Sequence, residues 1–328
     1  MEMLGNYQLL GELSSQNSGY SVWGFGIRDG REYFIKQFLS PKYPENDTVS
    51  SPERLQRKIA KCHQFEQEKQ AVYNQLNTNS DGNAVRVTEF FRIGTKYYIS
   101  MPKIRALPWI VATIKMLPEQ EKRRLCAIIA HSVASFHQGR IVHADLKHDN
   151  VLFTRTASGT VTAKIIDFDA SFLETAPPKA GDDIVGDLVY FSPEACRSIW
   201  GETVELTCKM DIFSLGVLFH QYFAGGLPAF DHRECSYPGE AVAKGLPLTM
   251  LKGIPEDVAE LIKKMLQPEG KDRPTAQEVF RALFVPVNRD IPVPSPVPVP
   301  QPVVPSYAPN VIQSSTVSGR PFYTPGDL

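Results

Sequence analysis

Four side chains in one part of the sequence have the types and spacing that phosphoryl transfer requires. Asp145, Lys147 and Asn150 lie in the run His-Ala-Asp-Leu-Lys-His-Asp-Asn, and Asp167 follows the isoleucine pair at 165–166. Moving a phosphoryl group onto a hydroxyl needs a base for that hydroxyl, a cation near the phosphate and oxygen ligands for Mg²⁺. An acid, an amine, an amide and a second acid supply these groups in order.

The sequence before this run predicts mainly strands. Aromatic-rich segments broken by glycine between residues 7 and 38 predict three strands, with a hairpin turn at Asp29-Gly30. A serine followed by proline and glutamate predicts the start of a helix from Pro52 to Leu76. Two further strands are expected near 85–93 and 96–101.

The sequence after these strands predicts mainly helices. From Pro118 the apolar residues recur at helical spacing. The loop with Asp145 comes next, then a short hairpin of 151–153 with 163–166, and then helices from 194 to 283. Strands first and helices later predict an α+β fold with two lobes around a cleft, and the chemistry lies at their junction.

The run with Asp145 and the segment 165–169 closely resemble the catalytic and metal-binding loops of the eukaryotic-type protein kinase family. His-Ala-Asp stands in place of the family's H-R-D, and Asp-Phe-Asp in place of D-F-G. Lysine at 147 resembles the serine/threonine kinases more than the tyrosine kinases. The resemblance implies a bilobal kinase-like fold, with a small β-rich N-lobe holding one long helix over 1–103 and a larger, mainly helical C-lobe over 104–284.

The resemblance also implies a role for each of the four side chains. Asp145 would accept the proton of the substrate hydroxyl or orient that hydroxyl, and Lys147 would lie beside the γ-phosphate. Asn150 and Asp167 would bind the Mg²⁺ that bridges the phosphates of ATP. The implied activity is transfer of the γ-phosphate from ATP to Ser or Thr hydroxyls of a protein substrate. The plain alternatives are a turn-forming aspartate at 145 and an Asx turn at 167.

Further residues resemble the family's nucleotide-binding parts. Tyr-Phe-Ile-Lys, which ends at Lys36, is similar to V-A-I-K. That lysine would contact the α- and β-phosphates and pair with a helix glutamate, for which Glu68 is the expected residue; an ordinary edge-strand lysine is the alternative. The phosphate-covering loop keeps glycine only at its ends, Gly11 and Gly19, so it would hold ATP more loosely.

The resemblance places the adenine between the lobes, at the end of the expected strand 96–101. Met101 would be the gatekeeper residue. Pro102 has no N–H, but its carbonyl would accept from the adenine amine, and backbone atoms near Ile104 would complete the contact.

Two more motifs imply structural roles. Ser-Pro-Glu, which ends at Glu194, resembles the A-P-E that closes the activation segment. Its glutamate pairs with a late arginine in the family, and Arg273 has the matching context. Asp211 resembles the aspartate that braces the backbone of the catalytic loop; a helix N-cap is the plain alternative.

The chain departs from the family at two positions of the catalytic motifs. Ala144 replaces the arginine that normally meets a phosphorylated activation loop, so we expect activity not to depend on phosphorylation of Ser171 or Thr175. Asp169 replaces a glycine, restricts the backbone and adds a carboxylate near the metal. This extra carboxylate leads us to expect a preference that leans towards Mn²⁺.

These departures leave three interpretations. The first is an active Ser/Thr protein kinase, because the side chains needed for chemistry are present. The second is a pseudokinase scaffold that binds partners through the C-lobe or the tail, which the irregular glycine loop, Ala144 and Asp169 favour. The third is a small-molecule kinase on the same fold, against which the motifs at Glu194 and Asp211 argue.

The composition changes near residue 285. Residues 286–328 hold 11 of the chain's 26 prolines and only four charged side chains. Proline lacks the backbone N–H and fixes φ, so we expect a flexible, polyproline-like tail over 285–328. Pro302–Pro305 is a PxxP sequence that fits an SH3-like or WW-like partner.

The overall composition of the 328 residues is that of an ordinary globular protein. A formal net charge of −1 gives no reason to expect nucleic acid or membrane binding by bulk attraction. The five cysteines are scattered and form no CxxC pair, which is typical of reduced thiols in a cytoplasmic protein. The first residues lack the pattern of a signal peptide, and no segment approaches the roughly 18 apolar residues of a membrane helix.

Overall fold

The computed structural model describes residues 2–15, 21–45, 47–79, 82–179 and 184–284. By its contacts the chain divides into two units, Met1–Val285 and Pro286–Leu328, and every described residue belongs to the first. The expected tail over 285–328 and the expected loop glycine Gly19 lie outside the described residues.

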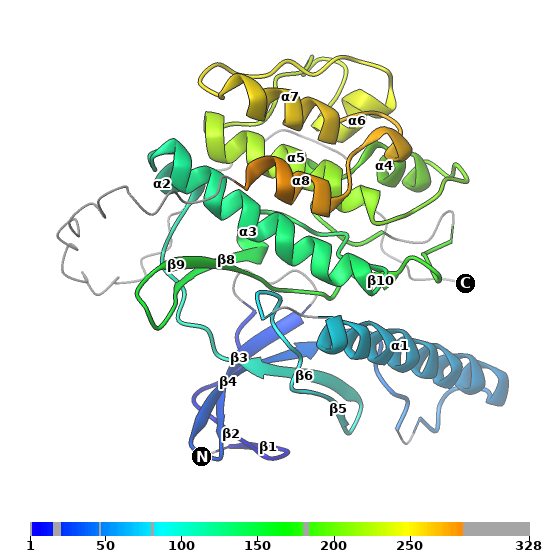
Figure 1. Ribbon diagram of the computed structural model, residues 1–328. Helices are drawn as coiled ribbons and strands as arrows, with labels where there is room; N and C mark the ends of the chain where they lie inside the picture. The colour runs from blue at the N-terminus through cyan, green and yellow to red at the C-terminus, as the bar shows by residue number, and fades with distance from the viewer. Residues whose placement is uncertain (1, 16–20, 46, 80–81, 180–183, 285–328) are drawn as a thin grey trace. The chain divides into compact units, whose positions relative to one another are not determined.

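The first part of the chain forms one six-stranded antiparallel sheet (Figure 1). Both residues of the turn between the third and fourth strands have positive φ, 51° at Asp29 and 73° at Gly30. A type I′ hairpin turn requires positive φ at both positions, so the predicted turn is confirmed. In spatial order the strands are β1 (Met3–Leu4), β2 (Tyr7–Leu9), β3 (Ser21–Arg28), β4 (Arg31–Phe38), β6 (Lys96–Pro102) and β5 (Glu89–Ile93).

Side chains along β4 alternate between the two faces of this sheet. Tyr33 and Ile35 are buried on one face, in a small core that they share with Tyr7 of β2. Lys36 projects from the other face and lies opposite Trp23 of β3 in the antiparallel register. The strand thus holds Lys36 on the face that the small core leaves uncovered.

The helix predicted from Pro52 is present as α1 (Pro52–Asn79), three residues longer than expected. Ser51 caps it, because the Arg54 backbone N–H donates to the Ser51 hydroxyl at 3.3 Å. The helix packs against α3 (Glu119–Gln138), β7 (Ile141–Val142) and β10 (Phe172–Leu173). Its buried residues lie at helical spacing and are Cys62, Val72, Tyr73 and Leu76.

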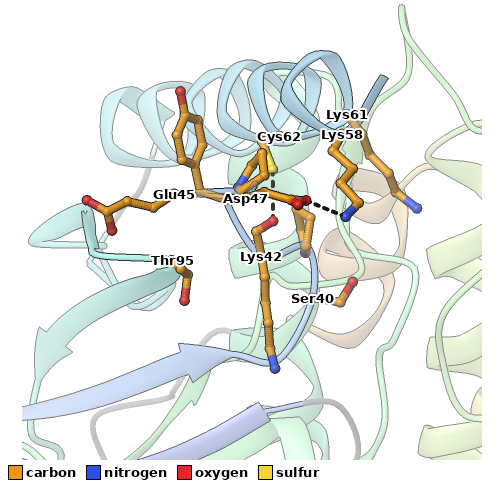
Figure 2. Close-up of a pocket in the computed structure, with 11 residues that line it drawn as sticks. Ser40, Lys42, Glu45, Asp47, Lys58, Lys61, Cys62 and Thr95 are labelled. Carbon is orange, nitrogen blue, oxygen red and sulfur yellow. Dashed lines mark hydrogen bonds and ion pairs between the residues drawn. The ribbon is translucent and has the colours of Figure 1, made fainter. Parts of the chain in front are cut away.

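A cavity of about 390 Å³ lies between the β4–α1 loop and the first turns of α1 (Figure 2). Lys58 pairs there with Asp47 at 2.7 Å, and the Cys62 thiol donates to the Lys42 carbonyl at 3.5 Å. None of the described residues expected to do chemistry lines this cavity.

Helices dominate the chain after residue 110, somewhat before the predicted start at Pro118. Besides α3 they are α2 (Val111–Lys115), α4 (Pro193–Ile199), α5 (Lys209–Ala224), α6 (Pro238–Ala243), α7 (Glu256–Met265) and α8 (Ala276–Leu283). The predicted hairpin is present as β8 (Val151–Arg155) and β9 (Val161–Ile165). Within the described residues, no helix combines the length and the apolar character needed to cross a bilayer.

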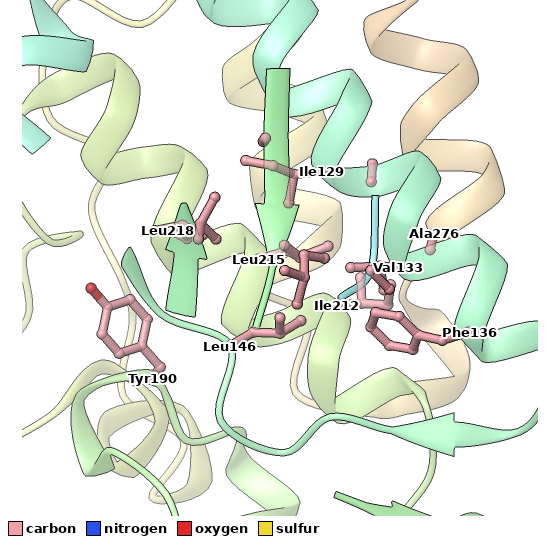
Figure 3. Close-up of a cluster of buried hydrophobic side chains, with 14 of the residues drawn as sticks. Ile129, Val133, Phe136, Leu146, Tyr190, Ile212, Leu215, Leu218 and Ala276 are labelled. Carbon is pink, nitrogen blue, oxygen red and sulfur yellow. The ribbon is translucent and has the colours of Figure 1, made fainter. Parts of the chain in front are cut away.

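The core of the helical region lies between α3 and α5 (Figure 3). Val133 and Phe136 of α3 and Ile212 and Leu215 of α5 are almost completely buried in it. Leu146, from the loop that carries Asp145, is buried in the same core. This packing anchors the middle of the loop that carries Asp145.

The strand expected over 85–93 is wrong in its first half, since β5 begins at Glu89. Val85 and Val87 are buried, which produced the alternating apolar pattern. The Val85 N–H, however, donates to Ile165 of β9 at 3.0 Å, outside the six-stranded sheet. The pattern therefore reflects burial against the hairpin and not pairing in the sheet.

Candidate active site

The β8–β9 hairpin brings the two expected metal ligands to one end. Asn150 directly precedes β8, and Asp167 follows the end of β9 by two residues. The Ile166 N–H donates to the Asn150 carbonyl at 3.0 Å, which continues the hydrogen bonding of the hairpin to this end. Asp167 then leaves the strand with a φ of 65°, a left-handed conformation that turns the chain sharply.

Asp145 lies at the centre of a small polar cluster. Its Oδ2 accepts from the Asn150 amide at 2.9 Å and lies 3.0 Å from the ammonium of Lys147. Its Oδ1 accepts from the backbone N–H of Asp187 at 2.9 Å. The structure therefore brings together the three expected residues of the catalytic loop, and the segment at 187 fixes the second carboxylate oxygen.

Asp211 braces the backbone that leads into this cluster, as predicted. Its carboxylate is fully buried in α5 and accepts from the N–H groups of His143 at 2.8 Å and Ala144 at 3.0 Å. A third bond of 2.9 Å joins it to Nε2 of His137. Ala144 has a φ of 65°, which is uncommon for a residue with a β-carbon. The buried carboxylate thus holds the loop in a conformation that alanine seldom adopts.

His143 links the two loops, a role that sequence reasoning missed. Its Nε2 lies 3.0 Å from the carbonyl oxygen of Ile166, and its Nδ1 accepts from the Asp145 N–H at 3.3 Å. Its ring lies 4.7 Å, centroid to centroid, from that of Phe168. The only sequence signal for this role was its position as the first residue of the His-Ala-Asp motif.

Lys36 crosses from the sheet to the loop after β9. Its ammonium lies 2.8 Å from Asp167 Oδ1 and 2.7 Å from Asp169 Oδ2. Burial alone would lower the pKa of Lys36, but the carboxylates of Asp169 and Asp167 outweigh it and raise that pKa. Lys36 is therefore a buried cation, which makes the edge-strand alternative wrong.

The expected ion pair between Lys36 and Glu68 is wrong. Glu68 is exposed on α1, where its carboxylate accepts from the Gln64 amide at 2.7 Å. Glu66 instead accepts from the Tyr97 hydroxyl at 2.7 Å. The inward position belongs to Lys69, whose ammonium donates to the backbone carbonyl of Asp169. Burial lowers the pKa of Lys69.

The register of α1 explains this error. One residue along a helix turns a side chain by about 100°. Lys69 lies seven residues after Cys62 and three and four before Val72 and Tyr73, so it falls near the middle of the buried stripe, whereas Glu68 lies at its edge and is exposed. Counting from the apolar residues, and not from the family motif, would have found the inward residue.

The expected glycine loop is only partly described. Gly11 is exposed, and a β-carbon built on it would meet no heavy atom within 4 Å. Its surroundings therefore do not require glycine. The other expected loop glycine, Gly19, lies outside the described residues.

The residues expected near the adenine lie at the end of β6. Met101 is buried and pairs in register with Phe34, two residues from Lys36. Pro102 is exposed and ends the strand. Ile104 is half-buried against the main core. Their contacts with adenine remain a prediction.

The expected pair between Glu194 and Arg273 is confirmed. The guanidinium binds both carboxylate oxygens, at 2.7 and 2.8 Å. Its remaining N–H groups donate to the carbonyls of Gln267, Lys209 and Pro268. The Arg273 side chain is 0% exposed. All five N–H donors of this buried cation are therefore satisfied by protein groups and not by water.

The residues at the end of the hairpin fit Mg²⁺ and ATP in their chemistry. Asp167 and the side-chain oxygen of Asn150 are the hard oxygen ligands that Mg²⁺ prefers. The Asn150 amide nitrogen is turned to Asp145, so its oxygen points the other way. Mg²⁺ commonly takes one or two protein ligands and completes its shell with phosphates and water. Among the described residues, no group of three or more His, Cys, Asp or Glu side chains is arranged to hold a metal.

Comparison with known families matches residues 51–285 to the protein kinase domain. The match covers well over half of the chain, so the chain belongs to the protein kinase domain family. The family typically uses ATP and a divalent metal. The matched segment begins after β4, so Lys36 lies outside it.

Curated relatives are serine/threonine kinases of greater length. A probable serine/threonine-protein kinase of Dictyostelium discoideum is 28% identical over 282 residues, which cover 83% of this chain and 17% of that protein. Calcium-dependent protein kinase 14 of Arabidopsis thaliana is 30% identical over 159 residues, 46% of this chain and 28% of that protein. The chain thus spans less than a third of the length of these relatives.

A similar solved structure is that of the Cydia pomonella granulovirus kinase PK-1. It matches with a TM-score of 0.59 and 17% identity, over 84% of this chain and 94% of that chain. The likeness shows the fold. The chain has the α+β kinase fold, with an N-terminal antiparallel sheet and helix followed by a helical region, as predicted.

Proposed function

We propose that this chain is an ATP-dependent protein kinase that transfers the γ-phosphate to Ser or Thr hydroxyls. The observation that carries the proposal is the cluster around Asp145, where Lys147 and Asn150 both contact one carboxylate oxygen. A carboxylate held by an ammonium and an amide is fixed in orientation, as a group that receives or orients a hydroxyl proton must be.

Each residue of the proposed site has a separate task. Asp145 orients the acceptor hydroxyl and takes its proton, and Lys147 neutralises charge on the transferred group. Lys36 binds the phosphates next to the transferred one. Asn150 and Asp167 hold Mg²⁺, which supplies charge neutralisation at the phosphates when it is bound.

The main alternative is a pseudokinase scaffold that binds partners through the C-lobe or the tail. One observation favours it. Trp23, Phe25 and Phe34 form an aromatic cluster on the sheet face that carries Lys36, and the rings of Trp23 and Phe34 stack at 5.7 Å. Phe34 stands where the V-A-I-K motif has alanine, so a large ring narrows the space beside the expected adenine position.

Label transfer from γ-labelled ATP separates these two functions. We would incubate the chain with Mg²⁺ and Mn²⁺ separately, with and without a basic generic protein substrate, and identify the labelled amino acid. Phosphoserine or phosphothreonine that disappears in Asp167→Asn is the expected result, with more product in Mn²⁺ than in Mg²⁺. Equal amounts of product with the two metals would refute the expected preference for Mn²⁺ but not the kinase activity. ATP binding without transfer under either condition would establish the scaffold.

We further propose that the kinase is not switched through an arginine in the H-R-D position. Ala144 has no group that could meet a phosphate, and Ser171, early in the expected activation segment, is buried with its hydroxyl donating to the His143 carbonyl at 3.0 Å. A kinase cannot reach this hydroxyl without opening the loop. Activity that survives phosphatase treatment would support the proposal, and loss of activity would refute it.

The proline-rich segment suggests a separate binding function. We propose that Pro302–Pro305 binds an SH3-like or WW-like domain, because a PxxP sequence presents a preformed polyproline surface to aromatic grooves. Titration of a panel of such domains with the full chain and with the chain lacking 286–328 tests this. Binding that needs the segment supports the proposal, and equal binding by both chains contradicts it.

A further inference from the structure

In this chain the carboxylate that accompanies Asp167 at Lys36 comes from the loop after β9 and not from α1. We propose that Asp169 is a positioning residue for Lys36, and that Lys69 is the compensating cation that α1 supplies to Asp169. The inference rests on the proposed phosphoryl transfer, since it describes how the phosphate-binding lysine is held. It treats the lysine at the inward position of α1 and the aspartate that replaces glycine at 169 as one exchange of charge.

The contacts of Lys36 carry the first part of the argument. Its ammonium is within 2.8 Å of two carboxylates that are only two residues apart, Asp167 and Asp169. Its side chain is 11% exposed, so water contributes little to holding it. Among the described residues, no glutamate or aspartate of α1 pairs with it. The loop after β9 therefore supplies both charge partners of Lys36.

The contact of Lys69 carries the second part. Lys69 occupies the inward position of α1 and donates to the backbone carbonyl of the same residue, Asp169. A glutamate at this position would place a third carboxylate beside Asp167 and Asp169, against the single cation Lys36. Lysine instead gives two cations and two anions in one half-buried cluster, in which the Asp167 and Asp169 side chains are 31% and 22% exposed. A buried charge is tolerated when it is paired, so the balanced set is the stable one.

The arrangement also changes what α1 controls. In the family, the pair between the strand lysine and a helix glutamate forms only when the helix is in place. Here both partners of Lys36 lie on the loop after β9, and α1 reaches that loop through Lys69. The Asp169 carboxylate is held through Oδ2, which pairs with Lys36, while its Oδ1 is buried without a hydrogen-bond partner in the described part of the chain. Lys36 should therefore remain held when the contact of Lys69 is removed.

Matched substitutions test the assignment of the carboxylate. Asp169→Asn and Glu68→Gln make the same chemical change at the two residues that could serve Lys36. We expect Asp169→Asn to lower kcat/KM for ATP by about tenfold or more, mostly through KM, and Glu68→Gln to leave it unchanged. An effect of Glu68→Gln as large as that of Asp169→Asn would overturn the assignment.

A charge-exchange cycle tests the compensation. Lys69→Glu alone leaves three carboxylates with one lysine, and adding Asp169→Gly removes one of them and recreates the family arrangement. We expect the double variant to recover most of the kcat/KM and of the thermal midpoint that Lys69→Glu loses. A double variant no better than Lys69→Glu in either measurement would overturn the inference.

The two readouts separate this inference from the proposed function. If the wild-type chain transfers no phosphate with either metal, the kinase proposal fails. In that case two measurements still test whether residues 69 and 169 have exchanged charges. They are the thermal midpoint of each variant in the cycle and its affinity for a fluorescent ATP analogue. Thermal midpoints that are additive across the cycle would refute the coupling of 69 and 169, whether or not the chain is active.

Discussion

Replacing Asp211 with asparagine should weaken both the fold and the proposed catalysis. The carboxylate accepts three hydrogen bonds, from the N–H of Ala144 to Oδ1 and from the N–H of His143 and Nε2 of His137 to Oδ2. In Asp211→Asn an NH₂ group replaces one of these oxygens. An NH₂ group in place of Oδ2 leaves two buried donors, the His143 N–H and His137 Nε2, without an acceptor. An NH₂ group in place of Oδ1 leaves one, the Ala144 N–H.

The loss in the free energy of unfolding is estimated from the orientation that leaves only one donor without an acceptor. One buried donor without an acceptor costs about 1–3 kcal/mol. The two remaining bonds lose their charge assistance, which is worth roughly 1 kcal/mol in total. We therefore expect the free energy of unfolding to fall by about 2–4 kcal/mol. Because Ala144 would no longer be held at a φ of 65°, we expect kcat to fall by about 100-fold.

Denaturant titration measures the first effect, and label transfer at saturating ATP measures the second. Asp231→Asn is the matched control, since Asp231 is an exposed residue whose carboxylate accepts hydrogen bonds from Arg233 in its own loop. It should change neither quantity. A loss of stability below about 1 kcal/mol in Asp211→Asn, together with an unchanged kcat, would refute the bracing role.

Three further predictions concern other parts of the fold. Arg273→Met should lower the free energy of unfolding by about 3–5 kcal/mol in a denaturant titration, because it leaves the buried Glu194 uncompensated. The double variant Arg273→Met with Glu194→Leu should recover part of that loss. An equal loss in both variants would contradict the energetic coupling of Arg273 and Glu194. The second prediction concerns His220, which is buried. Its Nε2 accepts from the Leu251 N–H at 3.1 Å and its Nδ1 lies 2.7 Å from the Gly226 carbonyl, so the ring is held in its neutral form. Burial lowers the pKa of His220. The unfolded state then binds the extra proton, so the stability from this group is complete above about pH 6.5 and declines below it, by at most about 1.4 kcal/mol per pH unit; His220→Gln should show a shallower decline, and an unchanged slope counts against it. Ser171→Ala should keep phosphate transfer at the wild-type rate in the label assay, and inactivity of a folded variant would show that the hydroxyl is needed.

Local spacing was enough to predict much of the site. Asp145, Lys147 and Asn150 lie within six residues, so any loop that keeps them on one side brings them together. Asp167 follows a strand, and the hairpin before it fixes where that strand ends. The pair of Glu194 and Arg273 spans 79 positions and was predicted from two motifs of the family.

Contacts that depend on helix register or on tertiary packing were not predicted. The choice of Glu68 over Lys69 failed because a one-residue shift on α1 changes which side chain faces the loop. The contact between Lys36 and Asp169 joins a strand to a distant loop, and the sequence signals it only as a departure from glycine. The aromatic cluster of Trp23 and Phe34 likewise becomes visible only when the strands are aligned.

The most direct test of the proposed function is the rate of phosphate transfer by Asp145→Asn relative to the wild-type chain, at saturating ATP and with equal binding of the ATP analogue verified. Asparagine keeps the shape of the side chain but cannot take a proton. We expect transfer by the wild type and a fall in kcat of about 100-fold or more in the variant, with nucleotide affinity unchanged. Transfer by Asp145→Asn at the wild-type rate would contradict the role given to Asp145 and the function built on it.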